Sequence, residues 1–286
     1  MATISLNYLS SFREETFRIK AGMRLKNPQD AVEFVNQRGF VFFWPNKGTI
    51  LPSIWTATAG DRPVPNEHDD PGHVTWGWKD DLLDKRVWFY GRVLRRRNAM
   101  ISLDLLPYFY ALSPNYGDPE NDYLEQYQQG VMTFESKSIY EALLNEGPLD
   151  TLALRRAARL SSETSSARFA RSLDDLQMEY KILPVGVSRV GGWNYAFVYD
   201  IVARYHPQVQ EAARFITEQA AQRKLAEVYL LSVGAMRARD LSHLLRWTPA
   251  NAKTIMKKLS DSHEMVRACE HPTEKGEWIA LNQVLA

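Results

Sequence analysis

The spacing of apolar residues in the second half of the chain repeats one pattern, in which three helices precede two strands. A predicted helix places Ile139, Leu143 and Leu144 on one face and ends at Gly147. A short helix, a leucine-rich helix and a β-hairpin around Gly191 follow in that order. Three helices and a hairpin form a winged-helix domain, which is a helix-turn-helix with a β-hairpin appended.

The same order of elements recurs nearer the C-terminus. The pattern predicts one continuous helix over 211–234, a short helix, and a third helix capped by Thr248 with Pro249 at its first position. Two strands around a turn at Gly276 complete the repeat. Because the pattern occurs twice in succession, it favours tandem domains.

The N-terminal part has a more divergent pattern. Asn27 and Pro28 are typical of a helix start, and Gly39 is typical of the helix end. The apolar run Phe40–Trp44 follows directly. We therefore predict an α+β, mostly α fold with three tandem winged-helix domains. Their predicted boundaries are 1–130 for a divergent N-terminal domain, 131–207 for the middle domain and 208–286 for the C-terminal domain.

An arginine-rich turn lies between two runs of β-type composition, residues 87–94 and 100–105. We interpret this segment as a hairpin with arginines at its tip, although a continuous helix also fits the composition. Basic residues interleaved with aromatic ones are typical of a surface that contacts phosphates, and the alternative is an edge strand protected by charge. The basic residues that we predict to bind DNA here are Lys85, Arg86, Arg92, Arg95, Arg96 and Arg97.

The third helix of each C-terminal repeat is a candidate recognition helix. Its polar and basic face suits contact with a DNA groove or backbone, but any exposed helix can carry such residues, and winged helices also bind proteins. In the middle domain the candidates for DNA contact are Arg168 and Arg171. In the C-terminal domain they are Asn251, Lys253, Thr254, Lys257 and Lys258.

A loop rich in Asp and His could carry chemistry. Glu67, His68, Asp69, Asp70 and His73 lie close together, but their spacing matches no closed metal site, and no cysteine is nearby. We expect a polar loop without a metal. The alternative is that a carboxylate of this loop acts as a general acid or base in a cleft that faces DNA.

The composition adds few constraints. The net charge is +1, so only local clusters of charge can favour binding to nucleic acid. Cys269 is the one cysteine, which excludes an internal disulfide and fits a reducing compartment. No apolar run is long enough to span a membrane, and we see no secretory signal. We expect a cytoplasmic protein, associated with the nucleoid if its source is bacterial.

The middle of the chain resembles the AlkZ/YcaQ-type DNA glycosylases, which repair alkylated bases and interstrand cross-links. The stretches "GPLDTLALRRAARL" and "WNYAFVYDIVARYHP" are similar to that family in order and spacing, clearly from Thr133 onward and more loosely before it. The resemblance implies tandem winged helices around a concave surface that binds double-stranded DNA. It also implies that no metal or organic cofactor is needed.

The chemistry of that family depends on a Gln-apolar-Gln or Gln-apolar-Asp motif after a Gly-containing strand, where the polar pair positions a water and stabilises the cationic sugar. In this chain "RGFV" at 38–41 matches the segment before the motif. Phe42, Phe43 and Trp44 then occupy the motif. None of them can act as a base, and only the Trp indole N–H can donate a hydrogen bond.

We therefore favour a DNA-binding protein on a glycosylase-like scaffold whose base excision is lost. One alternative is an active, monofunctional glycosylase in which Glu67, Asp69 or Asp70 activates the water. Trp44 or Phe42 would then stack on a base or fill the gap that it leaves. Another is a winged-helix transcription regulator.

Overall fold

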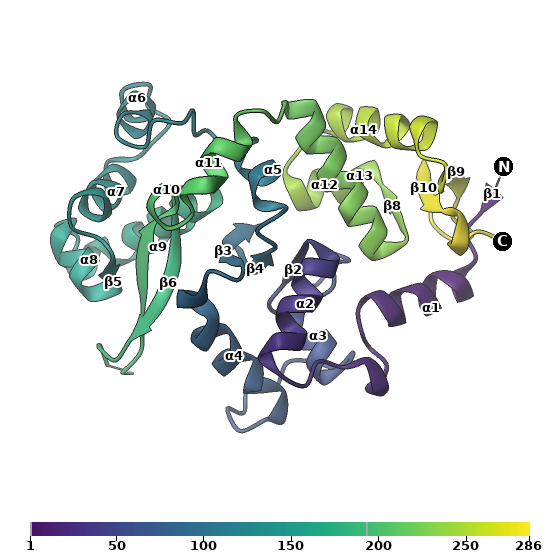
Figure 1. Ribbon diagram of the computed structural model, residues 1–286, viewed down its shortest axis with the longest axis horizontal. Coiled ribbons are helices and arrows are strands. Elements are labelled where there is room, and N and C mark those ends of the chain that lie inside the picture. The colour runs from purple at the N-terminus through teal and green to yellow at the C-terminus, as the bar shows by residue number, and fades with distance from the viewer. Residues whose placement is uncertain (1, 193) are drawn as a thin grey trace.

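The chain was analysed as a computed structural model that describes residues 2–192 and 194–286. Figure 1 shows three groups of helices and small sheets side by side, with residues 28–101 between the other two groups. The two chain termini lie next to each other at the edge of the C-terminal part. None of the described helices is long and apolar enough to cross a membrane.

The first unit, residues 28–101, has the order helix, strand, helix, helix, strand, strand. Its helices are α2 (Pro28–Arg38), α3 (Ile54–Ala59) and α4 (Val74–Leu82). Its strands are β2 (Phe40–Phe42), β3 (Phe89–Leu94) and β4 (Arg97–Ile101), paired in the order β2-β4-β3. The arginine-rich segment is thus a hairpin and not a helix.

The second unit, residues 134–201, has the same order of elements. Its helices are α7 (Phe134–Glu146), α8 (Thr151–Ala157) and α9 (Ser166–Met178). Its strands are β5 (Leu149–Asp150), β6 (Ile182–Ser188) and β7 (Ala196–Ile201), paired in the order β5-β7-β6.

The third unit, residues 218–281, repeats the order once more. Its helices are α12 (Glu218–Val233), α13 (Ala238–Leu245) and α14 (Pro249–Ser262). Its strands are β8 (Ala235–Arg237), β9 (Val266–Glu270) and β10 (Trp278–Leu281). In each unit the first strand pairs with the last, so all three have the winged-helix topology.

The remaining elements connect or extend the units. The helices are α1 (Leu6–Thr16), α5 (Leu106–Tyr110), α6 (Asp122–Gln128), α10 (Val202–Tyr205) and α11 (Pro207–Ala213). Short 3₁₀ turns are η1 (Ala21–Met23), η2 (Pro71–His73), η3 (Leu83–Lys85), η4 (Glu163–Ser165) and η5 (Asn282–Val284).

The structure corrects one predicted helix. Residues 211–234 do not form one continuous helix, because α11 ends at Ala213 and α12 begins at Glu218. The break is stabilised by Thr217, whose side chain accepts a hydrogen bond from the backbone N–H of Ala220 at 3.2 Å. The apolar spacing alone predicted one helix, but the Thr217 cap begins a new helix at this point.

The first residues of the chain belong to the third unit in space. Strand β1 (Ala2–Thr3) pairs in parallel with β9, and α1 packs on α12. The sequence pattern instead predicts these residues in an N-terminal domain of residues 1–130. A two-residue strand has too little periodicity to be recognised in the sequence, and its partner lies at the other end of the chain.

The largest apolar core is shared between the first and third units. Phe42 and Phe89 from the first sheet are fully buried, as is Leu225 on α12. Helix α5 contributes Leu106 and Phe109 to the same core. The outer face of the first sheet is therefore covered by α5 and the third unit.

Gly39 shows how closely these units pack. It ends α2 with φ +75°, and a Cβ built there would lie 2.6 Å from Val228 Cγ1 and 2.9 Å from Leu105 Cδ2. We expect Gly39→Ala to lower the free energy of unfolding by about 3 kcal/mol, because a positive φ and overpacking both cost energy. Urea unfolding measures the loss.

Gly48→Ala is the matched control, since Gly48 also has a positive φ, +80°, but a Cβ there meets no atom within 4 Å. We expect a loss of only about 1 kcal/mol from the backbone conformation. Equal losses in the two variants would contradict tight packing at Gly39.

His206, at the junction of α10 and α11, predicts a pH dependence. Its side chain is fully buried, and neither ring nitrogen has a hydrogen-bond partner within the described residues. Burial, with a smaller contribution from Arg86, lowers the pKa of His206 from 6.5 to about 4. The unfolded chain therefore takes up this proton at a higher pH than the folded chain does.

The stability contributed by neutral His206 is complete above pH 6.5, and we expect roughly 3 kcal/mol to be lost as the pH falls to 4. Unfolding by urea at a series of pH values measures this slope. His206→Leu should have a smaller slope by this amount over the same pH range. An identical slope in both proteins would rule out His206 as its source.

Candidate nucleic-acid interface

The strand at the expected catalytic motif is closed to solvent. The side chains of β2 alternate, so that Phe42 packs in the core shared with the third unit and Phe43 packs against the helices of its own unit. Phe42 is 0% exposed and Phe43 is 2% exposed. Neither ring can contact a substrate in this conformation.

Trp44, the third residue of this stretch, is half-buried in a cluster of aromatic side chains. Its ring centroid lies 5.3 Å from that of Trp55, 5.7 Å from His73 and 6.2 Å from Trp76. Trp76 is 43% exposed, so the cluster reaches the surface at the start of α4. The edge-on and tilted contacts are those of a packed aromatic cluster.

The three candidate carboxylates differ in their surroundings. Asp70 accepts two hydrogen bonds from Arg62, at 2.6 and 2.9 Å, and one from the backbone N–H of Gly72. The Arg62 hydrogen bonds lower the pKa of Asp70. Asp70 therefore stabilises its own loop, whereas Glu67 and Asp69 are exposed.

Across residues 2–192 and 194–286, no group of three or more His, Cys, Asp or Glu side chains is arranged to hold a metal ion. His73 instead packs against Trp44 and Trp55, and His68 packs against Trp76.

The arginine turn of the β3–β4 hairpin contacts both other units. Arg92 forms an ion pair with Asp174 at 2.8 Å, and Arg96 forms one with Asp175 at 2.5 Å. Arg95 donates a hydrogen bond to the backbone oxygen of His243 at 2.8 Å. These arginines have partners within the protein, and their side chains remain partly exposed.

The other basic residues of this segment have weaker contacts. Lys85 pairs with the neighbouring Asp84 at 3.2 Å, with both side chains exposed. The guanidinium of Arg86 lies 4.6 Å from the ring centroid of Tyr205. Arg97 is exposed. Their contact with DNA stays a prediction.

The second unit in turn contacts the recognition helix of the first. Lys79 on α4 is 4% exposed, donates a hydrogen bond to Tyr195 Oη at 2.9 Å and pairs with Asp80 at 2.6 Å. Its ammonium lies 4.6 Å from the ring centroid of Phe197 and 5.4 Å from that of Tyr90. Burial lowers the pKa of Lys79. The hairpin of each unit thus packs on the third helix of the other.

The recognition helix of the second unit is only partly available. The C-terminal half of α9 packs against β3, where Gln177 accepts a hydrogen bond from the backbone N–H of Arg92. Near its start, Arg168 pairs with Glu135 at 2.8 Å, and Arg171 is exposed. A DNA groove could reach only the first turns of this helix.

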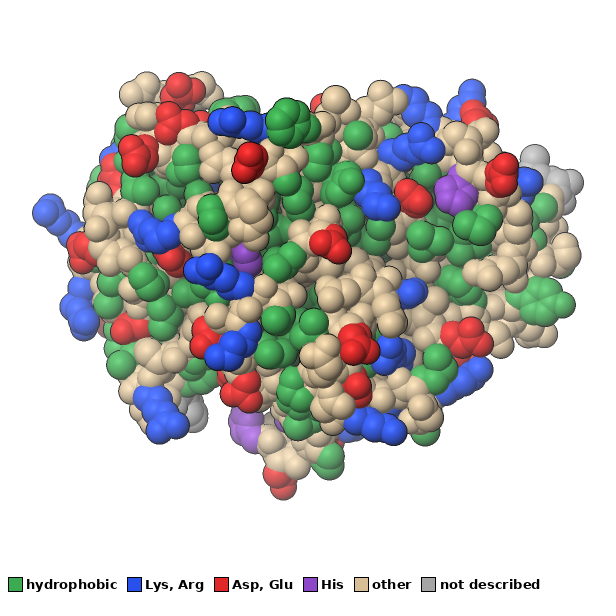
Figure 2. Space-filling view, in the orientation of Figure 1, with side chains coloured by type: hydrophobic (Ala, Val, Ile, Leu, Met, Phe, Trp, Pro, Cys, Tyr) green, Lys and Arg blue, Asp and Glu red, His purple; other side chains and the backbone are tan. Residues whose placement is uncertain are grey.

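The recognition helix of the third unit is the exposed one. Ala252, Ile255, Met256 and Leu259 on α14 face the core. On the opposite face all five predicted DNA-contacting residues are exposed: Asn251, Lys253, Thr254, Lys257 and Lys258. Figure 2 shows Lys and Arg side chains over α14 at the edge of a face that otherwise mixes both charges.

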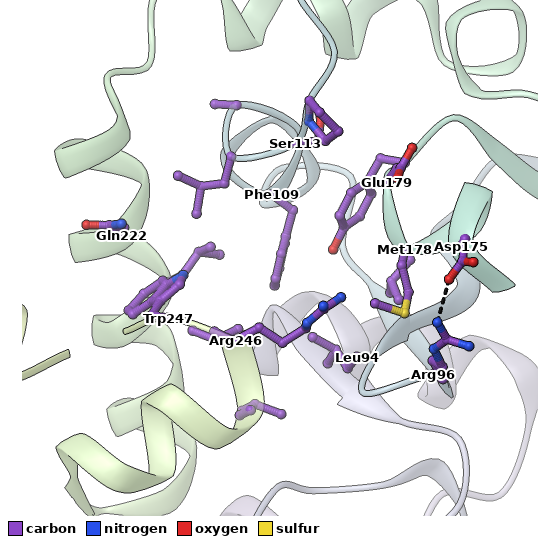
Figure 3. A pocket seen from close by; sticks show the side chains of 18 of the residues that line it. Leu94, Arg96, Phe109, Ser113, Asp175, Met178, Glu179, Gln222, Arg246 and Trp247 are labelled. Carbon is purple, nitrogen blue, oxygen red and sulfur yellow. Dashed lines mark hydrogen bonds and ion pairs between the residues drawn. The ribbon is translucent and has the colours of Figure 1, made fainter. Parts of the chain in front are cut away.

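A cavity of about 860 Å³ lies where the three units meet, beside the N-terminal end of α14. Figure 3 shows Trp247 and Arg246 on one side of it, and the Arg96–Asp175 ion pair with Met178 on the other. Asn251 belongs both to the lining of this cavity and to the basic face of α14.

These elements define the class of the molecule as a tandem winged-helix protein. Its structure is similar to that of the Streptomyces sahachiroi DNA glycosylase AlkZ, with a TM-score of 0.57 and 10% sequence identity over 98% of this chain and 71% of that chain. A likeness at this identity shows the fold. No curated protein matches the sequence significantly.

A family model described as AlkZ related matches residues 25–245. The chain therefore belongs to the AlkZ-related family, and the resemblance seen in the sequence is confirmed. The family membership and the likeness to the DNA glycosylase AlkZ agree on the same scaffold.

Sequence reasoning singled out Arg96 and Asn251 but missed most of the other residues that line the central cavity. Arg246 and Trp247 end α13 and precede the Thr248 cap, where an Arg-Trp pair could have been noticed. Glu179 and Tyr180 follow α9 and carry no local signal, because only the packing of distant units brings them to the cavity.

The buried aromatic at the motif position gives a direct prediction. We expect Phe42→Gln, which introduces an amide where the resemblance predicts the family's motif, to lose about 3 kcal/mol or more of unfolding free energy, because the amide replaces a fully buried ring. We also expect no base excision. Urea unfolding and alkaline cleavage of a duplex that contains an N7-alkylguanine measure the two outcomes.

Phe42→Leu is the control, since it keeps the site apolar and should lose roughly half as much stability. A Phe42→Gln protein that is as stable as the unmodified one and produces alkali-sensitive sites would show that the position is open to DNA.

Proposed function

We propose that this protein binds double-stranded DNA through the exposed face of α14, on a glycosylase-like scaffold whose base-excision centre is filled by aromatic side chains. The observation that carries the proposal is the difference between the three recognition helices. Helices α4 and α9 pack against hairpins of neighbouring units, whereas α14 leaves its basic face exposed.

The chemistry of α14 supports contact with a DNA backbone. Lys253, Lys257 and Lys258 are cations on a helix whose apolar face is buried, and lysine neutralises phosphates with release of counterions. Asn251 and Thr254 add hydrogen-bonding groups suited to base edges or phosphates. Since the net charge is only +1, this local cluster must supply the attraction.

The loss of base excision rests on the geometry of β2. A glycosylase needs a polar group beside the sugar of the extruded nucleotide. Phe42 and Phe43 are buried, and the carboxylate of Asp70 accepts hydrogen bonds from Arg62. We therefore propose a role in recognising damaged or distorted DNA within the repair of alkylation or cross-link damage.

Removing charge from α14 tests the proposal. We expect Lys257→Gln with Lys258→Gln to weaken binding to a duplex about tenfold or more and to reduce the salt slope by roughly two, since each lost phosphate contact lowers the slope by about one. Fluorescence anisotropy at several salt concentrations measures both quantities.

The matched control is Lys26→Gln with Lys47→Gln, which removes the same charge from two exposed lysines, one just before the first unit and one within it. We expect affinity and salt slope close to those of the unmodified protein. Equal weakening by both pairs, or no binding of the unmodified protein to any duplex, would refute the assignment to α14.

Base excision is tested separately with a duplex containing an N7-alkylguanine. We expect no alkali-sensitive sites. Strand breaks that disappear in Glu67→Gln or Asp69→Asn would instead establish an active glycosylase that uses the exposed carboxylates of that loop.

A further inference from the structure

The cavity between the three units has the size of a small-molecule site. Its volume of about 860 Å³ falls within the usual range of ligand pockets, roughly 300–1,000 Å³. It is bounded by the arginine hairpin, the exit of α5, the start of α7, the end of α9, the start of α12 and the α13–α14 corner. No chemistry has yet been assigned to it.

Aromatic and aliphatic side chains form the apolar part of the cavity wall. Phe109 and Tyr180 stack with ring centroids 5.9 Å apart, and Trp247 lies on the other side (Figure 3). Met178 and Leu94 fill the wall between them. Aromatic and thioether surfaces of this kind suit a planar ring.

The charged groups that line the cavity differ in their partners, and Glu218 accepts a hydrogen bond from Gln222 at 2.9 Å. Arg96 and Asp175 neutralise each other. In the described part of the chain, the side chains of Arg246 and Glu179 form neither a hydrogen bond nor an ion pair. Burial raises the pKa of Glu179, and the charge of Lys181, with a smaller contribution from Arg246, partly opposes that shift.

We propose that this cavity accepts a single nucleotide extruded from bound DNA. The base lies against Trp247 and Phe109, Arg246 binds the phosphate, and Glu179 accepts a hydrogen bond from an exocyclic amino group. A guanidinium offers paired donors to a phosphate, and a carboxylate accepts from amino groups such as N4 of cytosine. The proposal deepens the DNA-binding function and rests on it.

Other ligand classes fit the cavity less well. A free inorganic phosphate would be repelled by Glu179 and Glu218, which line the cavity with Arg246. A wholly apolar ligand would leave both Arg246 and Glu179 desolvated without partners. A nucleotide brings an anion, a planar ring and amino donors together.

The position of the cavity also fits DNA bound at α14. Thr248 and Asn251 line the cavity and lie at the N-terminal end of α14. Lys257 and Lys258 continue the exposed face of that helix. A strand held along α14 would therefore pass the cavity mouth, and a nucleotide could enter without leaving the strand.

The experiment compares a fully paired duplex with duplexes that carry one unpaired dC or dT. We expect the protein to bind the unpaired dC duplex about tenfold more tightly than the paired one, a difference of about 1.4 kcal/mol. Unpaired dT should gain less, because thymine has no exocyclic amino group. Fluorescence anisotropy measures all three affinities.

Variants assign the preference to the cavity. We expect Arg246→Gln and Trp247→Leu to reduce the preference for unpaired dC to about one, with little change for the paired duplex. Glu179→Gln should remove the discrimination between dC and dT, since an amide can also donate to thymine. Arg239→Gln, at an exposed arginine on α13 outside the cavity, should keep the preference.

A second arm separates the possible sources of the nucleotide. Free deoxycytidine monophosphate is titrated into the protein by calorimetry. Saturable binding that is lost in Arg246→Gln, without any preference for unpaired dC, would assign the site to a free nucleotide and overturn extrusion. No binding in this arm and no preference in the duplex arm would overturn the site altogether.

Failure of the proposed function has a different signature. The protein would then bind no duplex, and substitutions on α14 would have no effect, while the free nucleotide would still decide whether the cavity is a nucleotide site. A preference for unpaired dC that persists in Arg246→Gln and Trp247→Leu would place recognition elsewhere on the protein.

Discussion

A two-residue turn built from consecutive arginines in the β3–β4 hairpin contacts both of the other winged-helix units. Arg95 and Arg96 adopt left-handed φ values of 54° and 56°, where hairpins usually carry Asn-Gly, and each non-glycine residue there costs on the order of 1 kcal/mol. The ion pair of Arg96 with Asp175 and the hydrogen bond of Arg95 to the His243 carbonyl offset this cost. One turn thereby touches all three units and forms a wall of the cavity between them.

The packing between the first two units explains why only the recognition helix of the third unit is available to DNA. Exposed ion pairs contribute little energy each. The contact between the first two units therefore depends mainly on the buried side chains where each hairpin packs on the third helix of the other unit. There, Lys79 on α4 lies among Tyr90, Tyr195 and Phe197, and Gln177 on α9 is bonded to β3. Residues that could have contacted DNA instead hold the units together, and α14 keeps the exposed cations.

Local signals in the sequence predicted much of the fold. The caps at Asn27 and Thr248 begin α2 and α14 as expected, and the arginine turn joins two strands. Contacts between residues far apart in the chain could not be predicted from these local signals. Arg92 pairs with Asp174 across 82 positions, and neither residue carries a signal for the other. The cavity could not be predicted either, because Glu179 and Arg246 meet there only once the units are packed.

The aromatic run after Gly39 follows from the same packing. In an isolated winged helix, the outer face of β2 would be open, and a polar residue at position 42 could reach a substrate. Here α5 and α12 cover that face, so Phe42 joins a core in which a polar side chain would lack partners. Val93 and Leu94 belong to the same core and line the cavity. Glu179 and Arg246 line the same cavity from the second and third units, so ligand chemistry in this region depends on the junction between the units.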